Sequence, residues 1–189
     1  MGTVKTRIAS SLGPERAREI YCEIAESVFR QARRVPTVTL RFSPDDAHAE
    51  IRSWCDSPSW FFTGQGDGDM GARLVGAFDD MFRLGAERVV LVGTDSPEIT
   101  TRDFSDAFAA LHHADLVLGP AADGGYWLVG LRKPQPALFS GIRWSSSSVL
   151  ENTLAVARSL SLSVQQLRVL HDIDTAEDWD RYQERKGKA

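Results

Sequence analysis

Cysteine and long apolar segments are scarce in this sequence. Cys22 and Cys55 are the only cysteines among its 189 residues. Two cysteines can form neither a disulfide framework nor a zinc site built from thiolates, so we expect two reduced thiols. No apolar run reaches the ~18–20 residues that a membrane span needs, and residues 1–7 lack the apolar core of a signal peptide. These absences predict a cytoplasmic protein without a membrane span.

Basic clusters and the common catalytic motifs are absent as well. Lys and Arg number 22 against 26 Asp and Glu, which gives a net charge of −4, and no block of cations occurs. This mild acidity argues against nucleic acid or an anionic membrane as the main partner. The chain contains no P-loop, no G-x-S-x-G and no G-x-G-x-x-G. Its four histidines also lack metal-ligand spacing: His48, His112, His113 and His171.

What is present is an alternation of helix-period and strand-like segments along the whole chain. A composition that is 42% hydrophobic and 25% charged is typical of globular proteins. At roughly 150 residues per domain, we expect one α/β domain over residues 1–189, with a mostly parallel sheet flanked by helices. The expected strands cover about residues 38–42, 60–63, 89–92, 115–118, 126–131 and 164–169. The expected helices begin near residues 14, 44, 69, 101, 147 and 175.

Local signals refine this pattern at three places. Residues 89–92 read Val-Val-Leu-Val, an apolar run of the kind that parallel sheets bury on both faces. Thr100 and Thr175 each precede an acidic first turn and are expected to cap helices. The serine run 145–148 favours a helix cap over a nucleophile.

Carboxylates follow the ends of the expected strands, where open parallel sheets bind ligands. Asp95 leaves strand 89–92, and Asp123 lies between two strands. Asp172 and Asp174 follow the last strand. Asp95 alone is equally compatible with an ordinary turn, and Asp174 with a residue beside a helix cap. Together they can converge on Mg²⁺, which binds one or two carboxylates along with substrate phosphates.

Two further segments carry groups suited to a ligand. The loop 123–127, Asp-Gly-Gly-Tyr-Trp, combines paired glycines, which let a backbone approach a ligand closely, with an acid and aromatics, although a plain tight turn explains it too. Lys5 and Arg7 flank Thr6 ahead of a helix, which suits a phosphate, although a solvated terminus has the same composition. Trp144 is the tryptophan that we expect near a ligand.

Six segments of the chain, in order, carry a resemblance to a known family. They are Val4–Arg7 with Leu12–Pro14, Gln65–Arg73, Gly93–Pro97, Gly119–Leu128, Trp144–Ser145 and Asp172–Thr175. Together they resemble bacterial glycosyltransferase-like proteins labelled radical-SAM/selenodomain-associated transferases, which are related to the 2-phospho-lactate guanylyltransferases. The resemblance covers nearly the whole chain and implies the Rossmann-like nucleotide-diphospho-sugar transferase (GT-A) fold.

The resemblance also implies a role for each matching residue. Asp95 and Asp174 would bind Mg²⁺ or Mn²⁺, and Asp123 would be the catalytic base. The nucleotide-binding residues would be Lys5, Thr6, Arg7, Gln65, Asp69 and Arg73. The substrate-binding residues would be Gly124, Gly125, Tyr126, Trp144 and Ser145.

The sequence departs from the family at two places. Ala176 stands where the related Asp-Thr-Pro-Glu-Asp motif has proline. Family members also begin with a buried strand and a Pro-x-Pro-Gly turn before Lys5, whereas here Met1 stands where a proline would be. A missing central strand would leave two unpaired sheet edges and remove half of the nucleotide site.

Three functions remain open at this point. The first is metal-dependent glycosyl transfer from an NDP-sugar to a small acceptor. The second is nucleotidyl transfer from a triphosphate to a small phosphorylated or carboxylated metabolite. The third is a truncated relative without catalysis. The first two imply a nucleotide-activated donor and a small-molecule acceptor as partners, and both are compatible with a homo-oligomer.

Overall fold

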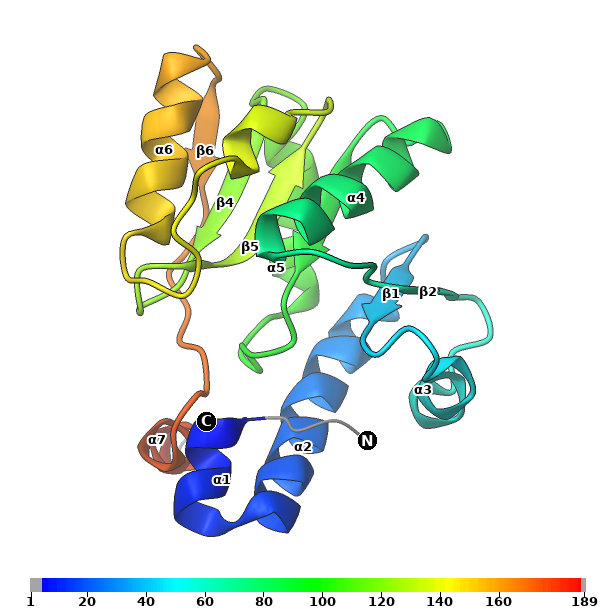
Figure 1. The fold of residues 1–189 in the computed structure, drawn as a ribbon, viewed down its shortest axis with the longest axis vertical. Helices are drawn as coiled ribbons and strands as arrows, with labels where there is room; N and C mark the ends of the chain where they lie inside the picture. Colours follow the sequence, from blue (N-terminus) through cyan, green and yellow to red (C-terminus); the bar gives the residue numbers. More distant parts are fainter. Residues whose placement is uncertain (1–4, 188–189) are drawn as a thin grey trace.

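The computed structural model describes residues 5–187. Val4 and Met1, which enter the family resemblance, lie outside that range. The fold is α/β, as expected, with two sheets (Figure 1). The smaller pairs β1 (Thr39–Phe42) in parallel with β2 (Phe61–Gly64). The larger has the order β3 (Val89–Val92), β5 (Tyr126–Leu131), β4 (Leu116–Pro120) and β6 (Val164–Gln166), and within it β5 alone runs against its neighbours.

Most helices begin within two residues of the positions that the sequence predicts, because their local signals are strong, but the helix expected near residue 44 begins only at His48, after a turn over residues 45–47. Pro14 occupies the first turn of its helix, and Thr100 and Thr175 form capping boxes with Asp103 and Asp178. Ser148 stands at a helix start, but its side chain makes no capping hydrogen bond. The long helices are α2 (Pro14–Ala32), α3 (His48–Cys55), α4 (Met70–Arg83), α5 (Thr101–Ala110), α6 (Val149–Ser159) and α7 (Ala176–Lys186); a short 3₁₀ helix covers Pro136–Phe139.

Two further expectations were wrong. Residues 5–7 were placed ahead of a helix, but Thr6 begins a helix of its own, α1 (Thr6–Leu12). The apolar strand β3 was expected to be buried on both faces, yet only Val89 is buried and the next three residues are half-buried. The physical reason is that β3 has one strand neighbour, the antiparallel β5, among the described residues.

One small apolar cluster brings the two ends of the described chain together. Helices α1 and α7 lie side by side at the lower end of the molecule (Figure 1). Their shared cluster contains Ile8, Ala17, Ile20, Ile24, Ile173 and Trp179. Burial of these side chains places Lys5, at the start of α1, beside the segment that leads into α7. Two larger clusters pack the remaining helices against the sheets.

Within residues 5–187, no helix is long and apolar enough to cross a bilayer. The expected cytoplasmic location stays a prediction. Cys22 and Cys55 are both free thiols, as expected.

Candidate nucleotide and metal site

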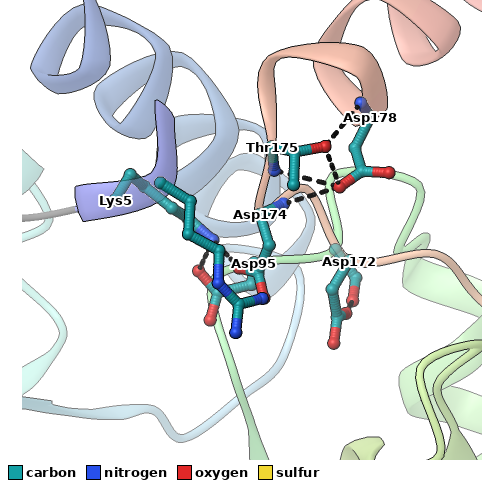
Figure 2. Close-up of polar contacts among 8 residues, drawn as sticks. Lys5, Asp95, Asp172, Asp174, Thr175 and Asp178 are labelled. Carbon is teal, nitrogen blue, oxygen red and sulfur yellow. Dashed lines mark hydrogen bonds and ion pairs between the residues drawn. The ribbon is translucent and has the colours of Figure 1, made fainter. Parts of the chain in front are cut away.

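Lys5 joins two carboxylates that come from distant parts of the chain. Its Nζ lies 2.6 Å from a carboxylate oxygen of Asp95, which follows β3, and 2.9 Å from one of Asp174, which precedes α7 (Figure 2). The Lys5 side chain is only 7% exposed, whereas the carboxylates are 47% and 45% exposed. The expectation that Asp95 and Asp174 converge is therefore confirmed as geometry.

The charges explain why a lysine is stable at this buried position. Burial by itself lowers the pKa of the Lys5 ammonium, but the attraction and hydrogen bonds of Asp95 and Asp174 outweigh it and hold the pKa above its ordinary value. Lys5 also adopts a left-handed backbone, with φ 49°, which is unfavourable for a residue with a side chain. The fold holds Lys5 in this conformation, with its ammonium between the two carboxylates.

Backbone contacts fix the segment that carries Asp174. The backbone N–H of Ile173 donates to the carbonyl of Asp95 at 3.0 Å. One carboxylate oxygen of Asp178 accepts from the backbone N–H groups of Asp174 and Thr175, at 3.3 and 2.9 Å, and from the Thr175 hydroxyl at 2.7 Å (Figure 2). The helix cap of α7 therefore also positions Asp174 against the end of β3.

Asp172 adds a third carboxylate that points toward the same region. It accepts a hydrogen bond from the buried Ser96 hydroxyl. Burial, together with the nearby carboxylates of Asp123, Asp95 and Asp174, raises the pKa of Asp172 to about 6. From the sequence, Asp172 was a candidate only by its place after a strand and received no role. A raised pKa in a cleft is a signal that sequence alone does not contain.

The two converging carboxylates fit a divalent metal ion. In this structure the Lys5 ammonium shows that one oxygen of Asp95 and one of Asp174 can reach a single cation. Among residues 5–187, no group of three or more His, Cys, Asp or Glu side chains is arranged as a complete metal site. Mg²⁺ commonly binds one or two carboxylates and completes its shell with substrate phosphates and water. Asp95 and Asp174 can therefore supply the protein ligands of a magnesium site that substrate phosphates and water complete.

A large cavity extends from this site between the two sheets. Its volume is about 2450 Å³. Tyr126 and Trp144 meet on its wall in an edge-to-face contact, with ring centroids 6.4 Å apart. The expected site residues that line it are Arg7, Gln65, Arg73, Asp95, Asp123, Gly125, Tyr126, Trp144, Ser145 and Asp174.

Besides Lys5, which lies at the carboxylate pair, three expected site residues do not line this cavity. Asp69 accepts from the backbone N–H of Ala72 at 2.8 Å and so caps α4. Thr6 is exposed in the first turn of α1. Gly124 has φ +93°, and a Cβ there would clash with the carbonyl oxygen of Ser147. The backbone conformation and the lack of space therefore both require glycine at this position.

The structure adds one cation that sequence reasoning missed. Arg41 lines the cavity, donates to a carboxylate oxygen of Asp80 at 2.8 Å, and keeps its buried Nε without a hydrogen-bond partner. Its neighbour in the cavity is Arg73, which donates to the side-chain oxygen of Gln65 at 3.1 Å and also has an unpartnered buried Nε. In the sequence, the alternation of residues 38–42 places Arg41 on the polar face of the strand, where an arginine is ordinarily exposed to solvent.

The expected base, Asp123, is exposed at the tip of its loop. Its Oδ1 accepts from the backbone N–H of Gly125 at 2.9 Å, within the same tight turn. The loop is held from the other side by Leu150, whose N–H donates to the Gly124 carbonyl at 2.9 Å. Asp123 therefore faces the cavity from a well-fixed turn.

Comparison with known proteins gives three consistent matches. The family model described as "Uncharacterized protein conserved in bacteria (DUF2064)" matches residues 28–146. A phosphoenolpyruvate guanylyltransferase of Sphaerobacter thermophilus is 30% identical over 94% of this chain and 86% of its own length. A crystal structure from Desulfovibrio desulfuricans G20, provisionally described as a nucleotide-diphospho-sugar transferase, superposes with a TM-score of 0.90 at 33% identity, covering 96% of this chain and 80% of that one.

Proposed function

The chain belongs to the DUF2064 family of bacterial proteins, and we propose that it is a nucleotidyltransferase that transfers a guanylyl group from GTP to a small phosphorylated carboxylic acid. The similar guanylyltransferase from Sphaerobacter and the solved structure from Desulfovibrio both support a transferase. The observation that carries the proposal is the convergence of Asp95 and Asp174 on the buried Lys5 ammonium. Phosphoenolpyruvate, the acceptor in the name of the similar protein from Sphaerobacter, is the first acceptor to test.

The chemistry of this reaction agrees with the groups at the site. An ionised oxygen of the acceptor attacks the α-phosphorus of GTP and forms a new P–O bond. The bond from the α-phosphorus to the bridging oxygen breaks, and its electron pair leaves with pyrophosphate. Because the attacking oxygen is already ionised, the step needs no general base. The exposed position of Asp123 is compatible with that, since no buried base is required.

Cations of this chain would neutralise the phosphates. Lys5 lies at the carboxylate pair, and Arg7, Arg41 and Arg73 line the cavity that opens from it. Asp95 and Asp174 would hold Mg²⁺ or Mn²⁺, which when bound offsets the negative charge of the triphosphate and of the departing pyrophosphate. We place the nucleotide between these groups because fixed positive charges stabilise phosphoryl transfer most where negative charge develops.

Glycosyl transfer from an NDP-sugar is the second candidate. It is favoured by the solved structure from Desulfovibrio and by the Tyr126–Trp144 wall, because aromatic faces pack well against sugar rings. Here an acceptor hydroxyl would attack the anomeric carbon, the bond to the diphosphate oxygen would break, and Asp123 would take the hydroxyl proton. The products separate the candidates, since nucleotidyl transfer releases pyrophosphate and glycosyl transfer releases a nucleoside diphosphate.

A thermal-shift screen tests the donor directly. The protein is melted with GTP, other triphosphates, and GDP- or UDP-sugars, each with and without Mg²⁺ or Mn²⁺. We expect a metal-dependent rise in melting temperature with GTP that exceeds the rise with any NDP-sugar, because a ligand that binds only the native state stabilises it. A larger rise with an NDP-sugar would favour the second candidate. No rise with any nucleotide would leave the non-catalytic relative.

A further inference from the structure

The ammonium of Lys5 stands at the point where the two candidate metal ligands meet. Its Nζ lies 2.6 Å from an oxygen of Asp95 and 2.9 Å from an oxygen of Asp174 (Figure 2). A Mg²⁺ ion held by the same two oxygens would lie about 2.0–2.1 Å from each of them. The two positions nearly coincide, so the ammonium and a divalent ion cannot bridge this pair of oxygens at the same time.

The charge of Lys5 also competes with that of a metal ion. Asp95 and Asp174 carry two negative charges when both are ionised, and the ammonium offsets one of them. The Lys5 side chain is 7% exposed, so water and salt screen its charge little. Arg7 lies 3.7 Å from Asp174, but its side chain is 74% exposed and its charge is well screened. Of these two cations, Lys5 therefore reduces the attraction of the carboxylate pair for a divalent ion more.

The backbone of Lys5 is fixed, whereas its side chain can move. The Lys5 carbonyl accepts from the N–H of Ala9 at 2.8 Å, and the fully buried Ile8 anchors the same turn in the cluster of α1 and α7. Lysine carries its charge on a flexible four-carbon stem. Rotation within this stem moves the ammonium away from the carboxylates without disturbing α1.

The carboxylates are open to the side from which an ion and a donor would enter. Asp95 and Asp174 are 47% and 45% exposed, and both line the cavity together with Arg7. An ion that enters from the cavity therefore reaches these oxygens directly. A Lys5 side chain that turns toward the cavity would meet the phosphates of a bound donor, which provide a new partner for its charge.

We propose that Lys5 is an internal counter-ion, which holds the carboxylates of Asp95 and Asp174 together without metal and gives up its place when a divalent ion binds. The inference rests on the metal site of the proposed function and holds for either donor. It makes a divalent ion without phosphate a weak ligand, because the ion must displace the ammonium. Donor phosphates that accept the displaced ammonium then strengthen metal binding, and the metal strengthens theirs to the same extent.

A permanent brace is the competing role for Lys5. In that case the ammonium stays on its two oxygens, and a metal ion uses the other oxygens of the same carboxylates. Removing a brace loosens the carboxylates and weakens metal binding, whereas removing a competing counter-ion strengthens it. The two roles therefore predict opposite signs for the same substitution.

Metal binding without nucleotide measures that sign. The probe is Mn²⁺, which prefers the same oxygen ligands as Mg²⁺, and the free ion is followed by electron paramagnetic resonance. We expect Lys5→Met to bind Mn²⁺ more tightly than wild type, on the order of tenfold or more, because a unit charge beside the ion is removed. Lys186→Met, which removes an exposed lysine paired with Glu23, should bind like wild type. Adding Asp95→Asn to Lys5→Met should abolish the gain, which assigns it to the carboxylate pair.

Lysine acetylation of the wild type supplies the complementary test, which stands even if Lys5→Met does not fold. Acetic anhydride modifies exposed amines, and mass spectrometry measures each site. Without metal, the buried Lys5 should react far more slowly than the exposed Lys133 and Lys186. Saturating Mn²⁺ should raise the rate at Lys5 by about tenfold or more, because the displaced ammonium becomes accessible. The rates at Lys133 and Lys186 should stay unchanged.

The outcomes separate this inference from the proposed function. Equal or weaker Mn²⁺ binding by Lys5→Met would make Lys5 a brace and would leave the metal site standing. Lys5 that stays protected at saturating Mn²⁺ would also overturn the exchange, even with tighter binding by the variant, because the ammonium would then repel the ion without leaving. Absence of Mn²⁺ binding by every protein, Lys5→Met included, would remove the metal site itself and with it both proposals.

Discussion

The ammonium of Lys5 lies 2.6 Å from the carboxylate of Asp95, although the two residues come from the opening helix and from the end of a sheet strand. Together with the ion pair between Lys5 and Asp174, this contact links the apolar cluster of α1 and α7 to the segment that follows β3. Because Lys5 is 7% exposed, its charge is poorly hydrated and depends on these carboxylates. The contact between Lys5 and Asp95 therefore matters both for the stability of the fold and for the candidate metal site.

Replacing Lys5 tests the structural side of this contact. Lys5→Met leaves Asp95 and Asp174 close together with only the exposed Arg7, 3.7 Å from Asp174, as a nearby cation, so we expect the metal-free protein to lose on the order of 2 kcal/mol. That is less than the ~3–5 kcal/mol of fully buried pairs, because these carboxylates are half-exposed. Urea unfolding measures the change, and added Mg²⁺ should restore part of it. Lys186→Met, which removes an exposed contact to Glu23, is the control and should change stability by about 0–1 kcal/mol.

Replacing Asp95 tests the binding side. Asp95→Asn keeps the shape of the side chain and removes the charge that a divalent ion needs, so the Mg²⁺-dependent stabilisation by GTP should disappear. For the wild type, GTP at a hundred times its Kd should add about 2.7 kcal/mol. Asp106→Asn makes the same chemical change at an exposed pair with Arg102 and should keep the full shift. A metal-dependent shift that survives in Asp95→Asn would remove Asp95 from the metal site.

The raised pKa of Asp172 predicts a pH dependence of stability. Burial and the neighbouring carboxylates raise its pKa to about 6, against about 3.9 in an unfolded chain. Below about pH 4 the carboxyl is neutral in both states and has no effect; above pH 6 its charge destabilises the fold. Asp172→Asn should therefore be about 2 kcal/mol more stable than wild type at pH 8, without metal, and equal to it at pH 4. An equal difference at both pH values would contradict this.

The turn that carries Asp123 depends on glycine at position 124. Gly124→Ala forces a side chain onto a positive φ and against the Ser147 carbonyl. We expect a loss of about 2–3 kcal/mol in thermal or urea unfolding. Gly66→Ala is the matched control, because Gly66 also has positive φ but open space around it, so it should lose only about 1 kcal/mol. Equal losses would show that backbone strain alone matters.

The sequence predicted the local elements well and the pairing of strands less well. Capping boxes at Thr100 and Thr175, the proline of α2 and the four-residue spacing of α4 are local, so they could be read directly. The half-burial of β3 could not, because burial depends on which strands lie beside it, and that is set by contacts distant in sequence. The helix α1 was missed because its seven residues have one buried side chain, Ile8, and no capping side chain.

The candidate site was predicted in part for the same reasons. Asp95 and Asp174 were expected to converge because ends of parallel strands meet at one edge of a sheet, and they do. Lys5 was expected to meet substrate phosphates, and nothing in its spacing indicated that it would bond both aspartates. Arg41 and Asp172 became candidate site residues only because the fold buries them, and no local sequence pattern indicates that burial.

Product analysis tests the proposed reaction most directly. The protein is incubated with GTP, phosphoenolpyruvate and Mg²⁺ and followed by phosphorus NMR, with Asp95→Asn and Asp106→Asn in parallel. We expect pyrophosphate to appear in step with the loss of GTP and with one new phosphoanhydride product, in the wild type and in Asp106→Asn only. Release of a nucleoside diphosphate from an NDP-sugar, with no pyrophosphate from any triphosphate and acceptor, would contradict nucleotidyl transfer.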